Sequence, residues 1–200
     1  MTEKELGGGL PEITRYNSEQ RRDYLILVAA VAASDNELHP DELALLNRWM
    51  DQFDLPEESR TEVLAAANSE PKDLGDLERR LSQTDLVYSL ILDMMGMAMA
   101  DGVLMDDERV LLREVADYLE MDPIDFNILI EFVHATYQAS FLANPEPLYE
   151  HNIDSAFQLL RDKGIPLFAH TLLCVSSAEF DSKLKARWYQ YENLARSDGN

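Results

Sequence analysis

Apolar residues recur at helical spacing through most of the chain, and no segment alternates as an exposed strand would. Residues 24–34, YLILVAAVAAS, are apolar around most of a helical circumference and rich in alanine. This pattern predicts a central buried helix that its neighbours approach closely. Asn17 and Gln20 precede it with the three-residue spacing of a capping box. A second helix is expected from Pro40, a favourable first-turn residue, to about Asp54.

The remaining apolar runs predict further helices between breaks at Asn or Gly and Pro residues. Apart from the copy of the first two helices described below, they are expected at residues 56–68, 72–81, 124–142, 147–163 and 166–196. In the last of these, Leu184, Trp188, Tyr191 and Ala195 are spaced by four, three and four residues. That stripe lies on one helix face and is expected to dock on the core.

The sequence VAASDNELHPDELALL, residues 31–46, returns as MAMADGVLMDDERVLL at residues 97–112. A shift of 66 positions pairs Asp35 with Asp101 and also aligns the acids that follow them. Two copies are too few for an open solenoid, which needs about three repeats. We therefore expect an all-α, compact bundle of about seven to nine helices with an internal pseudo-symmetric repeat.

The same pattern suggests how the chain divides. Residues 1–16 contain three consecutive glycines and no apolar periodicity, which predicts a flexible N-terminal tail. A helical domain is expected at residues 17–141, with its two repeats at about 17–81 and 82–141. Residues 142–200 are expected to form a helical extension packed on the same domain.

The charge balance narrows the classes of partner. The chain has 17 Lys and Arg against 38 Asp and Glu, a formal net charge of −21. Such a surface repels nucleic-acid phosphates and anionic lipids and attracts cations or basic protein surfaces. The one cysteine, the lack of a signal-peptide pattern and the short apolar runs predict a cytoplasmic protein without membrane insertion.

Acidic residues gather where the second helix of each copy begins. Helix-start chemistry alone accounts for five of them, because the unpaired N–H groups of a first turn favour negative side chains. These five are Asp41, Glu42, Asp106, Asp107 and Glu108. Asp35 and Asp101 are expected at the end of the preceding helix, where an acid costs about 0.3–1 kcal/mol. A bound cation, or a hydrogen bond to the next helix's N–H groups, would compensate.

Oxygen ligands select a hard cation, here Ca²⁺, Mg²⁺ or Mn²⁺. An EF-hand does not fit, because the loop from Asp35 has no glycine at its sixth position and Leu46 at its twelfth. A site would therefore have to combine carboxylates from the two copies.

The doubled pattern, Asp-(Asn/Gly)-x-Leu followed by (Pro/Asp)-Asp-Glu at the head of an amphipathic helix, resembles the tellurite-resistance TerB family. The resemblance covers roughly residues 20–141 and extends to the TerB-like domains of membrane-anchored co-chaperones. It implies an all-helical fold with clustered acids that bind a divalent cation. The ligands carried over are Asp35, Glu42, Asp101 and Glu108, with Glu37, Asp41 and Asp107 as additional acids. Val103 stands where the family often has the counterpart of Glu37, so the second turn departs from the pattern.

The resemblance further implies a non-enzymatic binding or scaffold module in a stress response, such as tellurite or chemical stress or phage defence. Its partners would be proteins, including components of membrane-associated complexes, and not nucleic acid. The alternative is a metal-free acidic adaptor that docks a basic protein surface or mimics nucleic acid. An enzyme is the third hypothesis, and it would need a pocket with perturbed titratable groups.

Two features of the second buried helix bear on these alternatives. Asp93 interrupts the apolar run LILDMMGMAMA and is expected on a polar face of a partly exposed helix. The five methionines of this region are expected to fill the core rather than bind a soft metal, since no Cys or His is interleaved. They are Met94, Met95, Met97, Met99 and Met105.

Overall fold

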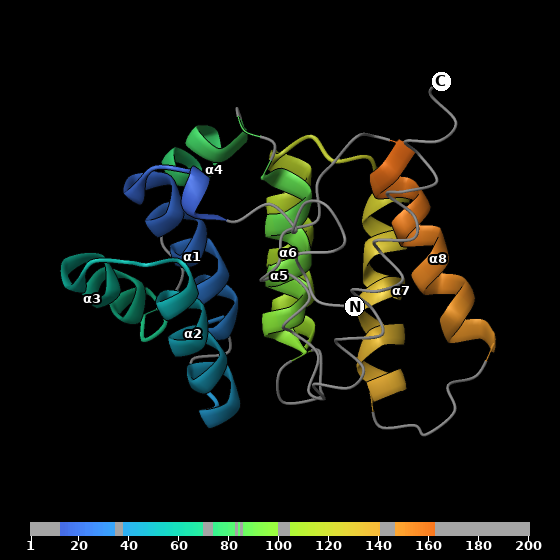
Figure 1. The fold of residues 1–200 in the computed structure, drawn as a ribbon, viewed down its shortest axis with the longest axis horizontal. Helices are drawn as coiled ribbons and strands as arrows, with labels where there is room; N and C mark the ends of the chain where they lie inside the picture. The colour runs from blue at the N-terminus through green and yellow to red at the C-terminus, as the bar shows by residue number, and fades with distance from the viewer. Residues whose placement is uncertain are drawn as a thin grey trace, which may run out of the picture.

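A computed structural model describes residues 13–34, 38–69, 74–82, 84, 86–99, 105–140 and 147–162. Within these ranges the chain is all-helical and contains no strand (Figure 1). The elements are a 3₁₀ helix η2 at Ile13–Arg15, then α1 Ser18–Ala32, α2 Pro40–Gln52, α3 Glu57–Ala66, α4 Gly75–Ser82, α5 Val87–Ala98, α6 Asp106–Tyr118, α7 Pro123–Ser140 and α8 Pro147–Asp162. The prediction of an all-α bundle is confirmed.

Local sequence signals set where the first helices begin. The Asn17 side chain accepts the backbone N–H of Gln20 at 2.9 Å, and the Gln20 side chain accepts the N–H of Asn17 at 3.2 Å. This reciprocal pair is the predicted capping box, and it satisfies two N–H groups that would otherwise lack a helical partner. Pro40 is the first residue of α2, where its missing N–H removes no helical bond.

Helix α1 lies at the centre of the bundle and packs against α2, α3, α4, α5 and α6. Nearly all of its residues from Asp23 to Ala32 are buried, including Tyr24 and the alanine pair Ala29 and Ala30. Small side chains let neighbouring helices approach on several sides. The prediction of a central buried helix is confirmed.

Helix α5 packs on α1, and α6 and α7 pack on α5 (Figure 1). Met94, Met95, Met97 and Met99 are buried in the common core, as the sequence pattern predicts. Met105 is different: 47% of it is exposed, directly before α6, so its assignment to the core is wrong. It is the N-cap residue of α6 rather than part of α5.

Helix α8 lies beside α7, and the rings of Phe132 and Phe157 meet at 5.6 Å between centroids. Helix α7 ends at Ser140 and α8 begins at Pro147, within one or two residues of their predicted bounds. Ile13, inside the predicted flexible tail, is buried against the core, while residues 1–12 lie outside the described ranges. The domain boundaries at 16 and 141 stay predictions.

Several local features return at the 66-residue spacing predicted for the repeat. Helices α2 and α6 are both 13 residues long and begin 66 positions apart. Each ends in a turn with one residue at positive φ, Asp54 at 46° and Glu120 at 56°. In each turn the next residue's N–H reaches back to a helical carbonyl, Leu55 to Met50 at 3.2 Å and Met121 to Ala116 at 2.9 Å. A repeat of the whole fold stays a prediction.

None of the helices in the described ranges combines the length and apolarity that crossing a bilayer requires.

Candidate functional site

The seven predicted ligands divide between described and undescribed residues. Asp35, Glu37 and Asp101 lie outside the described ranges, as does the predicted C-terminal helix at 166–196. Glu42 and Asp41 are placed in the first turn of α2, and Glu108 and Asp107 in the first turn of α6.

Glu42 and Glu108 occupy the same position in their helices and make the same bond. Glu42 Oε2 accepts the backbone N–H of His39 at 2.8 Å, and Glu108 Oε2 accepts that of Met105 at 2.6 Å. Both side chains are buried, with only 5% and 4% exposed. A carboxylate at a helix N-terminus is stabilised there by the helix dipole and by the N–H it accepts. Capping, predicted as one role of these residues, is confirmed by this geometry.

Asp41 and Asp107, by contrast, are exposed on the outer turns of α2 and α6. His39 Nδ1 accepts the backbone N–H of Asp41 at 3.3 Å, so the imidazole serves as a weak cap for α2. Met105 stands at the equivalent place before α6 and offers only a thioether. The two helix starts therefore share the glutamate but differ in the preceding cap.

The helices end earlier than the sequence pattern suggests. Helix α1 ends at Ala32 and α5 at Ala98, three residues before Asp35 and Asp101 respectively. Asp35 and Asp101 themselves lie outside the described ranges, so the predicted cost of an acid near these helix ends stays a prediction.

The described residues contain no group of three or more His, Cys, Asp or Glu side chains placed to hold a metal ion. Glu42 and Glu108 each serve a separate helix start and are not joined in such a group. Because three of the seven predicted ligands lie outside the described ranges, the shared cation site stays a prediction.

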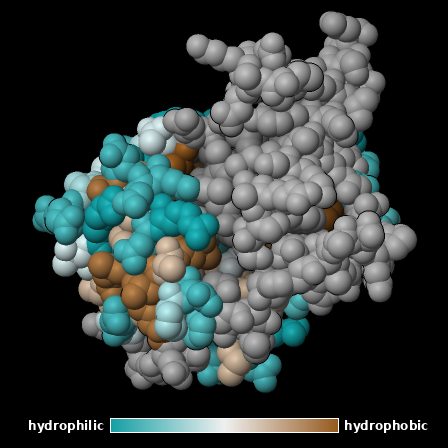
Figure 2. Space-filling view, turned by 60° about the horizontal axis from the view of Figure 1, so that its bottom comes forward, coloured by the Kyte–Doolittle hydropathy of each residue, from teal (hydrophilic) through white to brown (hydrophobic). Residues whose placement is uncertain are grey.

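A small pocket of about 100 Å³ lies where α1 and α3 end, beside Leu38, which precedes α2. It is lined by Ala33, Leu38, Ala67, Asn68 and Ser69. Figure 2 turns the lower end of the molecule forward and shows apolar side chains reaching the surface on the α1–α3 side, among hydrophilic ones.

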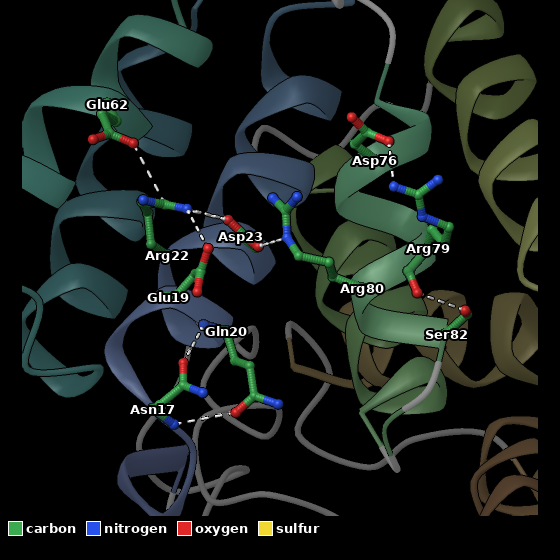
Figure 3. Close-up of polar contacts among 10 residues, drawn as sticks. All are labelled: Asn17, Glu19, Gln20, Arg22, Asp23, Glu62, Asp76, Arg79, Arg80 and Ser82. Atoms are coloured by element: carbon green, nitrogen blue, oxygen red, sulfur yellow. Dashed lines mark hydrogen bonds and ion pairs between the residues drawn. The ribbon is translucent and has the colours of Figure 1, made fainter.

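A buried carboxylate on α1 forms the densest ionic network among the described residues. Asp23 is 1% exposed, and its two oxygens accept Arg22 Nη2 at 2.9 Å and Arg80 Nε at 2.6 Å (Figure 3). Arg22 also reaches Glu62 of α3 at 3.4 Å and Glu19 at 3.7 Å. The network joins α1 to α3 and α4.

The hydrogen bond to Asp23 raises the pKa of both Arg22 and Arg80 above the ordinary guanidinium value, and the coulombic attraction of the same carboxylate adds to the effect. Both arginines thus stay charged throughout the working range of pH. The arrangement fastens α1 to α3 and α4.

Two further buried aspartates are paired with tyrosines across helix interfaces. The Tyr24 hydroxyl of α1 donates to Asp93 Oδ2 of α5 at 2.7 Å, and the Tyr88 hydroxyl of α5 donates to Asp125 Oδ2 of α7 at 2.7 Å. Asp93 is completely buried, so its predicted place on a partly exposed polar face is wrong.

Sequence reasoning overlooked these buried pairs because nothing local connects their partners. Tyr24 and Asp93 are 69 residues apart, and Asp23 and Arg80 are 57 apart. The available signal was an acid within an apolar run, since a carboxylate is rarely buried without a partner.

Comparison with protein families gives one match: the model of the tellurite resistance protein TerB covers residues 21–130, more than half of the chain. The chain belongs to the TerB family. Searches among curated proteins and among solved structures gave no match.

The TerB match runs from α1 into α7 and includes all seven predicted ligands. It also contains the three buried aspartates Asp23, Asp93 and Asp125. Helix α8 and the residues that follow it lie beyond the match.

Proposed function

We propose that this TerB-family chain is a non-enzymatic binding module that takes up a divalent cation, Ca²⁺, Mg²⁺ or Mn²⁺, at the α1–α2 and α5–α6 junctions. Asp35, Glu42, Asp101 and Glu108 are the ligands, and Glu37, Asp41 and Asp107 are the neighbouring acids. The module serves in the cytoplasm, in resistance to tellurite or in a related stress or phage-defence response. Its partners are proteins, including components of membrane-associated complexes.

The observation that carries this proposal is the pair of buried glutamates, Glu42 and Glu108. Each is at the third position of its helix and accepts the backbone N–H of the residue three positions earlier. Burial of a carboxylate at two related places is costly unless each is well compensated. Each glutamate accepts a backbone N–H, and a cation held together with Asp35 and Asp101 would add to that compensation.

The cation contributes positive charge at a point where several carboxylates repel one another. The role of the chain is to fix the glutamates through their N–H bonds, so that their orientation is set before binding. Ligands that prefer the folded state stabilise it, so cation uptake couples to the packing of α2 and α6 on the core.

The test is thermal unfolding of chelator-stripped protein with and without each cation. Binding at a hundredfold excess over Kd adds about 2.7 kcal/mol, which raises the Tm of a chain this size by roughly 5–10 °C. The rise should disappear in Asp35→Asn/Asp101→Asn and persist in Glu58→Gln, which changes an exposed acid on α3. An equal rise in the double variant, or none in the parent, would refute the cation site.

The second candidate is a metal-free acidic adaptor for a basic protein surface, favoured by the net charge of −21. Its partner affinity should fall steeply as salt rises and be indifferent to chelators. A cation-dependent module should instead change its partner affinity when a chelator removes the cation.

A further inference from the structure

Exposed apolar side chains are concentrated around one helix. The described residues expose five large hydrophobic side chains, and four of them lie on α6 or within six residues of its ends. These four are Met105, Val110, Tyr118 and Ile124, and the fifth is Leu43. Val110 is 56% exposed at the middle of the solvent side of α6.

The solvent side of α6 combines these apolar groups with negative charge. We define the outer face of α6 as six exposed residues that helical spacing places within about a third of a turn: Asp106, Asp107, Val110, Glu114, Asp117 and Tyr118. Four of the six are acids and none is basic, a charge of −4. Two bases lie to one side of this face: Arg109, which is exposed, and Arg113, whose guanidinium covers the ring of Phe126 of α7 at 4.2 Å.

Helix α2 is the natural control, because it has the same length and exposes the same positions. The six positions 66 residues earlier are Pro40, Asp41, Ala44, Arg48, Asp51 and Gln52, all exposed. They hold two acids and one base, a charge of −1 (1 − 2). Arg48 stands where α6 has Glu114, and Ala44 where α6 has Val110. Only the α6 face offers both an apolar centre and an acidic border.

The chain itself contains a segment of complementary chemistry. Residues 183–191, KLKARWYQY, hold three bases and no acid, in a chain whose net charge is −21. Leu184, Trp188 and Tyr191 repeat at helical spacing, with Arg187 beside them. These residues lie outside the described ranges. The 21-residue separation from Asp162, at the end of α8, reaches up to about 70 Å when extended, so α6 is within reach.

We propose that residues 183–195 dock on the outer face of α6, with Leu184, Trp188 and Tyr191 against Val110 and Tyr118. The bases of the segment then lie among the four α6 acids. A second copy of the chain is a poor occupant of this face, since two chains of −21 repel each other. This inference is independent of the proposed cation, and its tests are made in the presence of chelator.

The first test is carbodiimide cross-linking, which joins a lysine amine to a carboxylate only where the two are in contact. We expect amide links from Lys183 or Lys185 to acids of the outer face of α6 in the full-length chain. Mixing the chain with a ¹⁵N-labelled copy separates links within one chain from links between chains. Links between labelled and unlabelled copies, links to α2, or no link to α6 would each overturn the proposal.

The second test uses the two tryptophans, of which Trp49 is completely buried. Acrylamide, a neutral quencher, should leave most emission of the parent unquenched. Val110→Asp should expose Trp188 and make its share of the emission quenchable, whereas Ala44→Asp at the equivalent site of α2 should not. Because both changes are on exposed positions, circular dichroism should show an intact fold. Equal quenching of parent and Val110→Asp would overturn the proposal.

Discussion

Helices α2 and α6 end in the same type of backbone turn, but different side chains stabilise the two turns. At α2, Arg21 Nη1 donates to the carbonyls of Phe53 and Asp54, and Arg60 donates to Leu55 at 3.0 Å and Met50 at 3.1 Å. The positions 66 residues later are Val87 and Phe126. The guanidinium groups that cap carbonyls in the first half of the domain, residues 17–81, thus have apolar side chains as their counterparts in the second half, residues 82–141.

The contrast extends into the core. Asp23, with its two arginines, has Ser89 as its counterpart, and the buried Asp93 has Leu27. The backbone geometry of a helix end fixes only which N–H and C=O groups need partners. Either a charged side chain or a well-packed apolar neighbour with local backbone bonds satisfies that need, so related positions accept different residues.

The largest loss of unfolding free energy should come from the apolar residue of this comparison, Phe126. Phe126→Ala removes a ring that is 98% buried and lies under Arg113, and it should cost about 3–5 kcal/mol. Arg60→Ala, at the equivalent position of the first half, should cost about 1–3 kcal/mol, because its partly exposed guanidinium is replaced by water. Urea unfolding of both variants measures the difference. Equal losses would mean that the two positions do not play the different roles assigned to them.

Asp23→Ser gives position 23 the residue found 66 positions later, Ser89. We expect a loss of roughly 1–3 kcal/mol, reduced by solvent screening because Arg22 and Arg80 are partly exposed. Asp23 raises the pKa of both arginines. Stability from a raised pKa is complete below the unfolded value and is lost only as pH rises through the folded value. For guanidinium groups that window is strongly alkaline, so the loss should be constant from neutral to mildly alkaline pH.

The two tyrosine–aspartate pairs have equal bond lengths but different burial. Tyr24→Phe removes a fully buried donor to Asp93 and should cost about 1–3 kcal/mol. Tyr88→Phe removes a partly buried donor to Asp125 and should cost about 0.5–1.5 kcal/mol. Thermal unfolding of both variants and of the double variant compares them. A larger loss for Tyr88→Phe would show that burial does not set the strength of these bonds.

The smallest effect should come from the helix starts. Glu42→Gln and Glu108→Gln each keep a side-chain oxygen for the N-cap N–H but lose the charge, so each should cost about 0.3–1 kcal/mol in chelator. If a cation binds there, the loss grows when it is added. Amide hydrogen exchange in the first turns of α2 and α6 locates the effect. A loss that is identical with and without cation leaves capping as the sole role of these glutamates.

Within the described ranges, the sequence alone determined the helices, their main breaks and the chemistry of their first turns. Asn17 with Gln20, Pro40 and the glutamates Glu42 and Glu108 all act through neighbours within four residues, so a local pattern contains the necessary information. The resemblance to TerB could also be recognised from the sequence, because it rests on two short acidic motifs at a fixed spacing.

Only the tertiary structure decided which polar residues lie in the core. Asp93 pairs with a tyrosine 69 residues away, and Asp23 with an arginine 57 residues away. Whether a carboxylate in an apolar run faces water or a distant donor depends on how helices pack, and helical periodicity does not specify that. Side-chain partners across helices are fixed by the fold as a whole, whereas helix starts are fixed by a few adjacent residues.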